Sequence, residues 1–165
     1  MEKKTADYWI NQLDLEPHAE GGYFKQSFRS SEKLANQSRV LYTSIYFLLR
    51  EGEVSHFHRL QSDELWYFHA GQSLSIHMIH ENGEYEEVRL GLDIEEGEVP
   101  QIAVPKNTIF GSSVLTIGGF ALVGCMVSPG FEYQDFELFT QKQLLQDYPQ
   151  HEAIIKKLAY EILPE

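Results

Sequence analysis

The feature that most constrains the fold is a series of nine short segments rich in β-branched and aromatic residues, separated by turn-forming residues. They lie at residues 22–29, 40–49, 54–59, 64–69, 73–79, 84–90, 100–104, 108–116 and 119–127. Short strands at such spacing predict a nearly all-β sandwich or barrel. The pair Asn82-Gly83 between two of them predicts a tight hairpin with positive φ at both residues.

Helices are expected at both ends of this β-body. Thr5 predicts the N-terminal cap of a helix that runs to Leu13. Thr140 and Gln143 have the spacing of a capping box, and Pro149 predicts the start of a second C-terminal helix. The chain is therefore predicted to form a single domain over 1–165, with a helix and arm at 1–20, a β-barrel at 21–136 and outer helices at 140–163.

Charge and cysteine content limit the partners and the compartment. The net charge of -12 comes from 25 acidic and 13 basic residues, which repels phosphate backbones and anionic lipid surfaces. We therefore expect no nucleic acid and no membrane partner. Cys125 is the single cysteine, so an intrachain disulfide is impossible and a reducing compartment is favoured. Without an apolar N-terminal stretch or membrane span, these features predict a cytoplasmic protein.

The candidate chemistry lies between Gly52 and Gly71, where His56 and His58 alternate and Glu64 follows. Residues i and i+2 of a regular strand project from the same face, so both imidazoles are expected to converge inside a β-fold. A carboxylate from the next strand supplies a third group. Two imidazoles and one carboxylate suit a divalent transition metal with open positions.

This segment resembles the first signature of the cupin superfamily, in which a His-x-His pair follows a glycine and precedes a glutamate and a second glycine. Five residues separate His58 from Glu64, where three or four are usual, so Asp63 is an alternative for the carboxylate. We choose Glu64 because on a regular strand it shares a face with Trp66 and Phe68.

The chain also resembles, over nearly its whole length, a cupin subfamily catalogued as a domain of unknown function. The matching segments are Leu15–Tyr23 with Arg29-Ser30, Thr43–Leu49, Phe57–Leu60, Asp63–Trp66, Gly124-Cys125 and Val127–Phe131. The resemblance implies an all-β, double-stranded β-helix (jelly-roll) barrel with short flanking helices, usually a homodimer.

The second cupin signature places a fourth metal ligand three residues after the glycine of a Pro-x-Gly turn. Here the turn is Pro105-Lys106-Asn107, and Phe110 occupies the ligand position. Asn107 is an acceptable substitute for glycine because it tolerates left-handed geometry. The benzyl ring of Phe110 has no lone pair to donate, so the usual metal site lacks one ligand.

Three functions remain open at this point. In the first, the pocket binds a small polar metabolite such as a carbohydrate or nucleotide sugar without an obligatory cofactor, and His58 acts as base in an epimerase-like or isomerase-like reaction. Glu64 then positions His58 or serves as acid. In the second, the barrel binds or senses a ligand without catalysis. In the third, His56, His58 and Glu64 hold a divalent transition metal in an oxygenase or lyase.

Further residues are predicted to contact the ligand. Aromatic pocket walls are expected from Tyr46, Trp66, Phe68 and Phe110, although the same residues suit an ordinary barrel core. The N-terminal arm is expected to cover the pocket or a second subunit, and its candidates are His18, Glu20, Tyr23 and Arg29.

Overall fold

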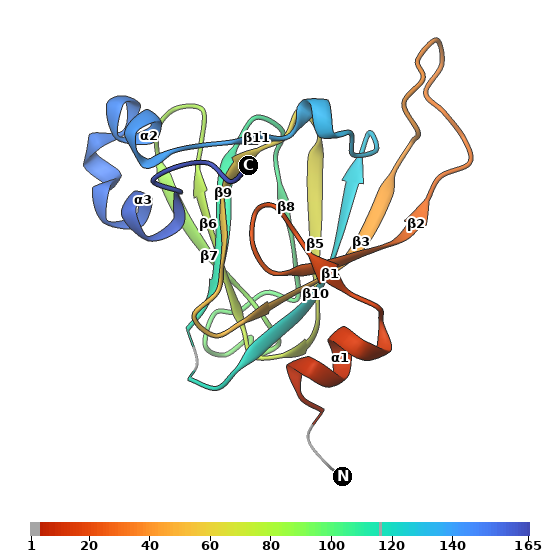
Figure 1. Ribbon diagram of the computed structural model, residues 1–165, viewed down its shortest axis with the longest axis horizontal. Helices are drawn as coiled ribbons and strands as arrows, with labels where there is room; N and C mark the ends of the chain where they lie inside the picture. Colours follow the sequence, from red (N-terminus) through yellow and green to blue (C-terminus); the bar gives the residue numbers. More distant parts are fainter. Residues whose placement is uncertain (1–3, 116) are drawn as a thin grey trace.

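The computed structural model describes residues 4–115 and 117–165, and it contains two antiparallel β-sheets that face each other (Figure 1). One sheet has the order β1-β2-β3-β10-β5-β8, and the other has the order β11-β4-β9-β6-β7. The strands are β1 (Glu16–Pro17), β2 (Tyr23–Arg29), β3 (Thr43–Arg50), β4 (Val54–Arg59), β5 (Asp63–Gly71), β6 (Leu74–Ile79), β7 (Tyr85–Leu90), β8 (Gln101–Val104), β9 (Ile109–Val114), β10 (Phe120–Ser128) and β11 (Glu137–Leu138). All nine predicted strands are confirmed, with small shifts at their ends.

The helices pack on the outside of the two sheets (Figure 1). Helix α1 (Ala6–Gln12) is capped by Thr5, whose Oγ accepts from the Tyr8 N–H, and it lies against β3 and β10. Helix α2 (Gln141–Asp147) begins with the predicted Thr140 capping box. The 3-10 turn η2 (Pro149–His151) leads into α3 (Glu152–Leu158), and a further 3-10 turn, η1, spans Tyr133–Asp135.

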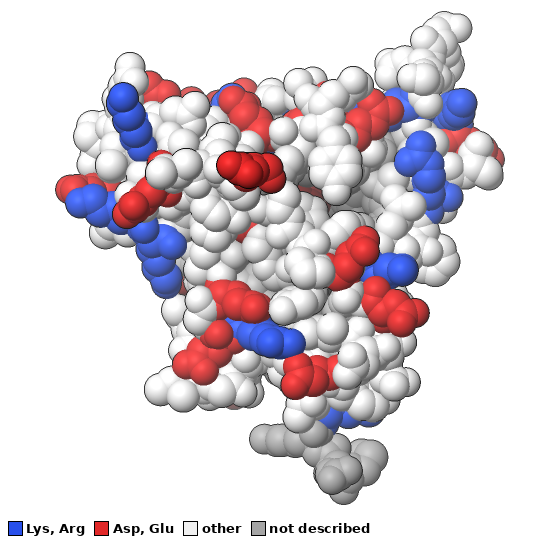
Figure 2. Space-filling model, in the orientation of Figure 1, with Lys and Arg blue, Asp and Glu red and all other residues white. Residues whose placement is uncertain are grey.

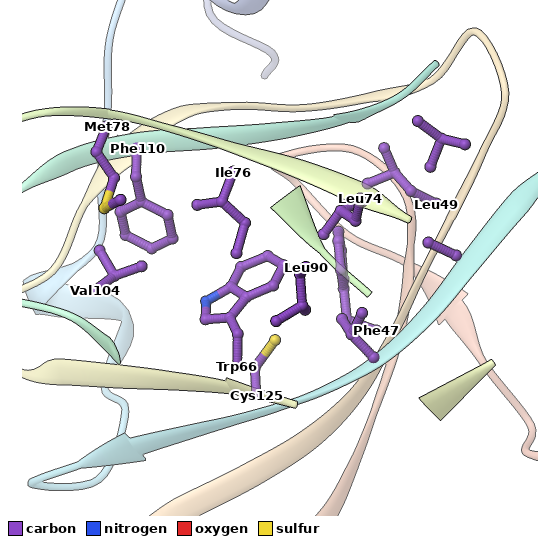
Figure 3. Close-up of a cluster of buried hydrophobic side chains, with 13 residues drawn as sticks. Phe47, Leu49, Trp66, Leu74, Ile76, Met78, Leu90, Val104, Phe110 and Cys125 are labelled. Atoms are coloured by element: carbon purple, nitrogen blue, oxygen red, sulfur yellow. The ribbon is translucent and has the colours of Figure 1, made fainter. Parts of the chain in front are cut away.

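The main core lies between the sheets and is built from inward side chains of both. Trp66, Phe47 and Phe110 are its largest members, each 1% exposed. Cys125 lies beside the Trp66 ring, as its cross-strand partner in β10 (Figure 3). Burial of one such aromatic side chain contributes about 1.5–3 kcal/mol. Trp66 and Phe110 therefore belong to the barrel core, the second of the two interpretations considered for them.

A β-bulge in β4 decides which side chains point inward. Ser55 pairs with Ser112 and His58 pairs with Phe110, so two residues of β4 face the single Gly111 between them. A Cβ on Gly111 would lie 2.5 Å from the Ser55 carbonyl oxygen, which explains why the smallest residue stands there. The expectation that His56 and His58 share a face assumed a regular strand, and the bulge makes it wrong.

Two turns test the predictions made from asparagine. In the β6–β7 hairpin Gly83 has a φ of 83°, whereas Asn82 does not take positive φ. The Asn82 Oδ1 instead accepts from the Glu84 N–H at 3.0 Å. The predicted hairpin is therefore confirmed, and the positive φ expected of Asn82 is wrong. Asn107 has a φ of 65°, as expected for a substitute of glycine.

Candidate functional site

A cavity of about 120 Å³ lies between the two sheets, beside the N-terminal arm and the segment 131–136. Its apolar walls are Phe24, Ile45, Phe47, Leu60, Val127, Phe131, Tyr133 and Phe136. Its polar lining groups are His18, Glu20, Gln26, Thr43, His58, Glu64 and Cys125. An apolar cavity with a few convergent polar groups is the usual form of a small-molecule site.

The central polar contact joins Glu20 of the arm to His58 of β4. The Glu20 Oε2 lies 3.2 Å from the His58 Nε2, and the Ser55 hydroxyl donates to Glu20 Oε1 at 3.0 Å. The His58 Nδ1 lies 2.7 Å from the His56 carbonyl oxygen. Because a carbonyl only accepts, Nδ1 carries the proton, and in a neutral ring Nε2 presents its lone pair to Glu20.

Burial disfavours the charged form of both members of this pair. It lowers the pKa of His58 to about 4, against the opposing effect of the hydrogen bond to His56. It raises the pKa of Glu20, against the opposing effects of His18 and Ser55. The contact of 3.2 Å places the Glu20 Oε2 against a ring lone pair, so one proton must lie between the two atoms to form a hydrogen bond. The pair holds one proton between two groups that line the cavity.

Glu64 places a second carboxyl in the cavity. Its side chain is buried in the cavity wall, and within residues 4–115 and 117–165 its Oε2 has no hydrogen-bond partner. Burial first and the Glu20 carboxyl second raise the pKa of Glu64 to about 8, and the neighbouring Trp66 and Cys125 act in the opposite direction. Burial raises the pKa of the Cys125 thiol as well, so that residue is not a thiolate nucleophile.

His18 completes the polar side of the cavity. Its Nδ1 accepts from the Glu20 N–H at 3.1 Å and lies 3.7 Å from Glu20 Oε2. Its ring contacts the Phe24 ring edge to face, with centroids 4.6 Å apart. Burial lowers the pKa of His18, so this ring is also neutral at physiological pH. His18 thus orients the arm that carries Glu20.

The structure brings four of the candidate residues together at the cavity, namely His18, Glu20, His58 and Glu64. His56 lies apart from them, stacked on Tyr160 with ring centroids 3.5 Å apart. Its Nδ1 lies 2.7 Å from the Glu20 carbonyl oxygen, to which its backbone N–H also donates. His56 therefore fixes the backbone of the arm rather than facing the cavity.

The remaining predicted contacts lie away from the cavity. Tyr46 packs on the outer face of its sheet, in the cluster beside α1. Tyr23 belongs to the same cluster and lies under the Arg50 guanidinium, 5.0 Å from ring centroid to Cζ. Arg29 is exposed at the end of β2, and Phe68 packs against the core. In nearly continuous apolar runs such as 43–49, polar and apolar residues do not alternate. The sequence therefore does not show which side chains of such a strand point inward and which point outward.

The donor groups do not fit a metal centre of two histidines and one carboxylate. The bulge separates His56 from His58, and the Nδ1 of each ring is engaged by a backbone carbonyl. Within residues 4–115 and 117–165, no group of three or more His, Cys, Asp or Glu side chains is arranged to hold an ion. The ligand set predicted from the His-x-His spacing is therefore not assembled.

Several cavity residues were not predicted. The missed groups are Phe24, Gln26, Thr43, Ile45, Phe47, Leu60, Cys125, Val127, Phe131, Tyr133 and Phe136. The alternation Phe24-x-Gln26 and Cys125-x-Val127 could have identified two pairs of them. The segment 131–136 reaches the cavity by a loop path, which no local pattern specifies.

A larger depression of about 810 Å³ lies beside α1. Its charged lining groups are exposed or half-buried, and Arg50 and Asp7 pair across it at 2.7 Å. Groups on such a solvated surface have their pKa values shifted far less by burial than groups in the interior cavity. The interior cavity is therefore the better candidate site.

Comparison with known proteins identifies the family. Residues 7–139 match the family model described as "Cupin superfamily (DUF985)", and the chain belongs to this family. The fold is thus the cupin-type barrel with short flanking helices.

Similar proteins occur in distant organisms. A solved protein from Shewanella oneidensis is 57% identical, with a TM-score of 0.90, and the match covers 99% of this chain and 100% of that one. A hypothetical protein from Leishmania major is 47% identical, with a TM-score of 0.91 and coverage of 95% and 99%. An uncharacterized protein from Saccharomyces cerevisiae is 27% identical over 76% of this chain and 71% of its own length.

An oxalate decarboxylase variant from Bacillus subtilis shares only 15% identity, with a TM-score of 0.58 over 94% of this chain and 42% of that one. At this identity the likeness shows the fold alone.

Two surface properties bear on partners. In the part of the chain that the structure describes, no helix has the length and apolar character needed to cross a membrane. On the face shown in Figure 2, Lys and Arg side chains are interspersed with Asp and Glu and form no continuous basic surface.

Proposed function

We propose that the chain binds a small polar metabolite in the interior cavity and exchanges a proton with it, in an epimerase-like or isomerase-like reaction. The observation that carries the proposal is the Glu20–His58 pair, whose Oε2 and Nε2 lie 3.2 Å apart in the same apolar cavity as the Glu64 Oε2, which has no hydrogen-bond partner among the described residues. A titratable pair of perturbed pKa in a buried cavity is the physical mark of a candidate acid–base site.

The proposed transfer runs through Glu20. When a ligand C–H or O–H proton moves to the Glu20 carboxyl, the proton already on Glu20 moves to His58 Nε2. The ligand is then the conjugate base, Glu20 is again a neutral acid, and His58 is an imidazolium. The His56 carbonyl, which accepts from Nδ1–H at 2.7 Å, stabilises that cation. Return of the proton from His58 through Glu20 to a neighbouring atom of the ligand completes an isomerisation and restores the neutral pair.

The cavity volume limits the reacting part of the ligand. A cavity of about 150 Å³ accommodates a benzene molecule, and this one is about 120 Å³. A larger metabolite such as a nucleotide sugar therefore places only one small group inside. The Glu64 Oε2, which no described residue hydrogen-bonds, is available to orient that group.

The experiment is proton exchange in deuterated water, followed by NMR with a panel of small amines, polyols and 2-oxo and 2-hydroxy compounds. We expect at least one compound to bind and to gain deuterium at carbon. Glu20→Gln and His58→Ala should abolish the exchange, while Asp63→Asn, an exposed acid outside the cavity, should leave it unchanged.

The outcomes separate the classes of function. Exchange that survives both Glu20→Gln and His58→Ala in folded protein would remove the proposed proton carriers. Binding without exchange would overturn catalysis and leave a ligand-binding or sensing barrel. A panel in which nothing binds would contradict the whole proposal.

Assembly and location belong to the same proposal. We propose a homodimer for two reasons. Strand β2 is paired with β1 only at residues 23 and 24, and no other described strand pairs with the rest of that edge. Phe28 on this strand is also 65% exposed. Sedimentation at micromolar concentration tests this, and a monomer would contradict it. A reducing, cytoplasmic location stays a prediction that rests on the single Cys125.

A further inference from the structure

We infer that the cavity selects an organic ammonium group, so that the small metabolite proposed above carries an amine. This inference rests on the proposed function and narrows it to one substrate class. Three independent observations lead to it: the charges of the lining groups, the unpartnered oxygen of Glu64 and the aromatic walls.

The lining groups favour a cation over an anion. Two carboxyl groups, Glu20 and Glu64, face the cavity, and none of its lining residues within the described chain is Lys or Arg. Arg39, which pairs with the segment 131–136, is engaged by Glu132 at 3.3 Å and by Asp135. The two histidines of the lining, His18 and His58, are neutral at physiological pH because burial lowers the pKa of each. A carboxylate or phosphate entering this cavity would therefore be buried without a cationic partner, which is strongly unfavourable.

Glu64 provides the specific recognition atom. Glu64 is only 7% exposed, and its Oε2 has no hydrogen-bond partner in the part of the chain that the structure describes. Such an atom is costly unless a ligand or water donates to it. An ammonium group donates up to three hydrogen bonds and converts this contact into a charge-assisted one, provided that Glu64 releases its own proton.

The walls are suited to the same group. Five aromatic rings line the cavity, and they are Phe24, Phe47, Phe131, Tyr133 and Phe136. The faces of aromatic rings attract cations, and cages of such rings are a common way for proteins to bind alkylammonium groups. The net charge of -12 also raises the local concentration of cations near the molecule. Once Glu64 has released its proton, its carboxylate beside aromatic rings is thus complementary to an ammonium group in charge.

The test compares three probes with the same hydrocarbon tail, n-butylamine, 1-butanol and butyrate, by calorimetry and by two-dimensional NMR of the full chain at pH 7.5. We expect the amine to bind at least about tenfold more tightly than the alcohol, the size of one charge-assisted hydrogen bond, and butyrate to bind most weakly. Chemical-shift changes should be confined to cavity residues.

Glu64→Gln should remove the preference for the amine over the alcohol. The matched control is Asp63→Asn, which makes the same change of charge at the neighbouring position, where the side chain is exposed and accepts from the Lys106 N–H at 2.8 Å. This control should keep the preference. The comparison within the unmodified protein does not depend on either variant folding.

Each outcome decides the inference. Tighter binding of 1-butanol or of butyrate would overturn the ammonium selectivity and leave the proposed cavity function intact. An amine preference that Glu64→Gln keeps would show that Glu64 is not the recognition atom and would also overturn the inference. If no probe binds while the proton-exchange panel gives a substrate, only the inference fails; if both experiments are negative, the proposed function fails with it.

Discussion

Two buried histidines of the five-stranded sheet have similar burial and different surroundings. His58 and His77 are 2% and 3% exposed, and burial lowers the pKa of each to about 4. His58 points from β4 to the interior cavity, whereas His77 points from β6 to the outer face, opposite its core-facing neighbours Ile76 and Met78. Comparison of these two histidines shows what distinguishes a residue of a candidate site from a buried residue with a structural role.

At His77 both ring nitrogens have fixed, neutral partners. The Tyr85 hydroxyl lies 2.7 Å from Nδ1, and the Ser113 hydroxyl lies 3.0 Å from Nε2. Burial and Glu87 raise the pKa of Tyr85 to about 12, so this phenol does not exchange its proton near neutral pH. At His58 one partner is itself a carboxylic acid, and a second acid with an unpartnered oxygen lines the same cavity. Burial with a lowered pKa is therefore insufficient; a titratable partner and space for a ligand make the difference.

The largest expected effect tests whether His77 is structural. His77→Ala should destabilise the protein by about 3 kcal/mol, because it leaves the buried Ser113 hydroxyl and the Tyr85 hydroxyl without a partner and opens a void. Denaturant unfolding measures this loss. The control, His80→Ala, removes a half-buried ring that pairs with Glu86 at the surface and should change stability by less than about 0.5 kcal/mol. Equal effects of the two variants would mean that the contacts of His77 contribute little.

The second prediction concerns how the free energy of unfolding depends on pH. In the folded state the pKa of Glu64 is raised to about 8 from 4.5, so between these values the folded protein keeps a proton that the unfolded chain loses. Stability should therefore fall as pH rises, by about 2 kcal/mol between pH 6 and pH 8. The two histidines affect the acid side of the stability profile. Because their pKa values are lowered from 6.5 to about 4, His58 and His77 make stability fall as pH decreases through that interval.

Unfolding free energies measured from pH 4 to pH 9 test both limbs. Glu64→Gln should flatten the neutral-to-alkaline limb and leave the acid limb in place, since the amide does not titrate. Glu20 contributes to the alkaline limb in the same direction, because its pKa is also raised. A Glu64→Gln profile that still falls as steeply as that of the unmodified protein would contradict the assignment of Glu64 as a buried acid.

The sequence predicted the architecture better than the site. Strand positions follow from local composition and turns, and the caps Thr5 and Thr140 follow from the preference of hydroxyls for helix N-termini. The choice of Glu64 over Asp63 as the inward carboxylate agrees with the structure, because alternation holds along β5. These features depend on interactions over a few residues.

The failures have non-local causes. His56 was expected at the cavity, but the bulge opposite Gly111 changes the side to which it points, and only the partner strand reveals that bulge. Tyr46 was expected there as well, but which face of β3 is inward depends on its pairing with β2 and β10. The role of Glu20 depends on the path of the arm, along which the Tyr160 hydroxyl donates to the Ala19 carbonyl at 2.9 Å. Such placements require the tertiary fold.

The smallest expected effect compares the two serine hydroxyls that support these histidine regions. Ser55→Ala removes the donor to Glu20 Oε1, and Ser113→Ala removes the partner of His77 Nε2. Each should cost about 1 kcal/mol in the free energy of unfolding, the usual net value of one buried hydrogen bond. The Ser55 hydroxyl also lowers the pKa of Glu20, so Ser55→Ala should raise that pKa and weaken proton exchange with the ligand. Ser113→Ala should leave proton exchange with the ligand unchanged. Exchange is measured by NMR under conditions in which both variants are equally folded. Equal exchange rates in the two variants would contradict the view that only the His58 region is chemically active.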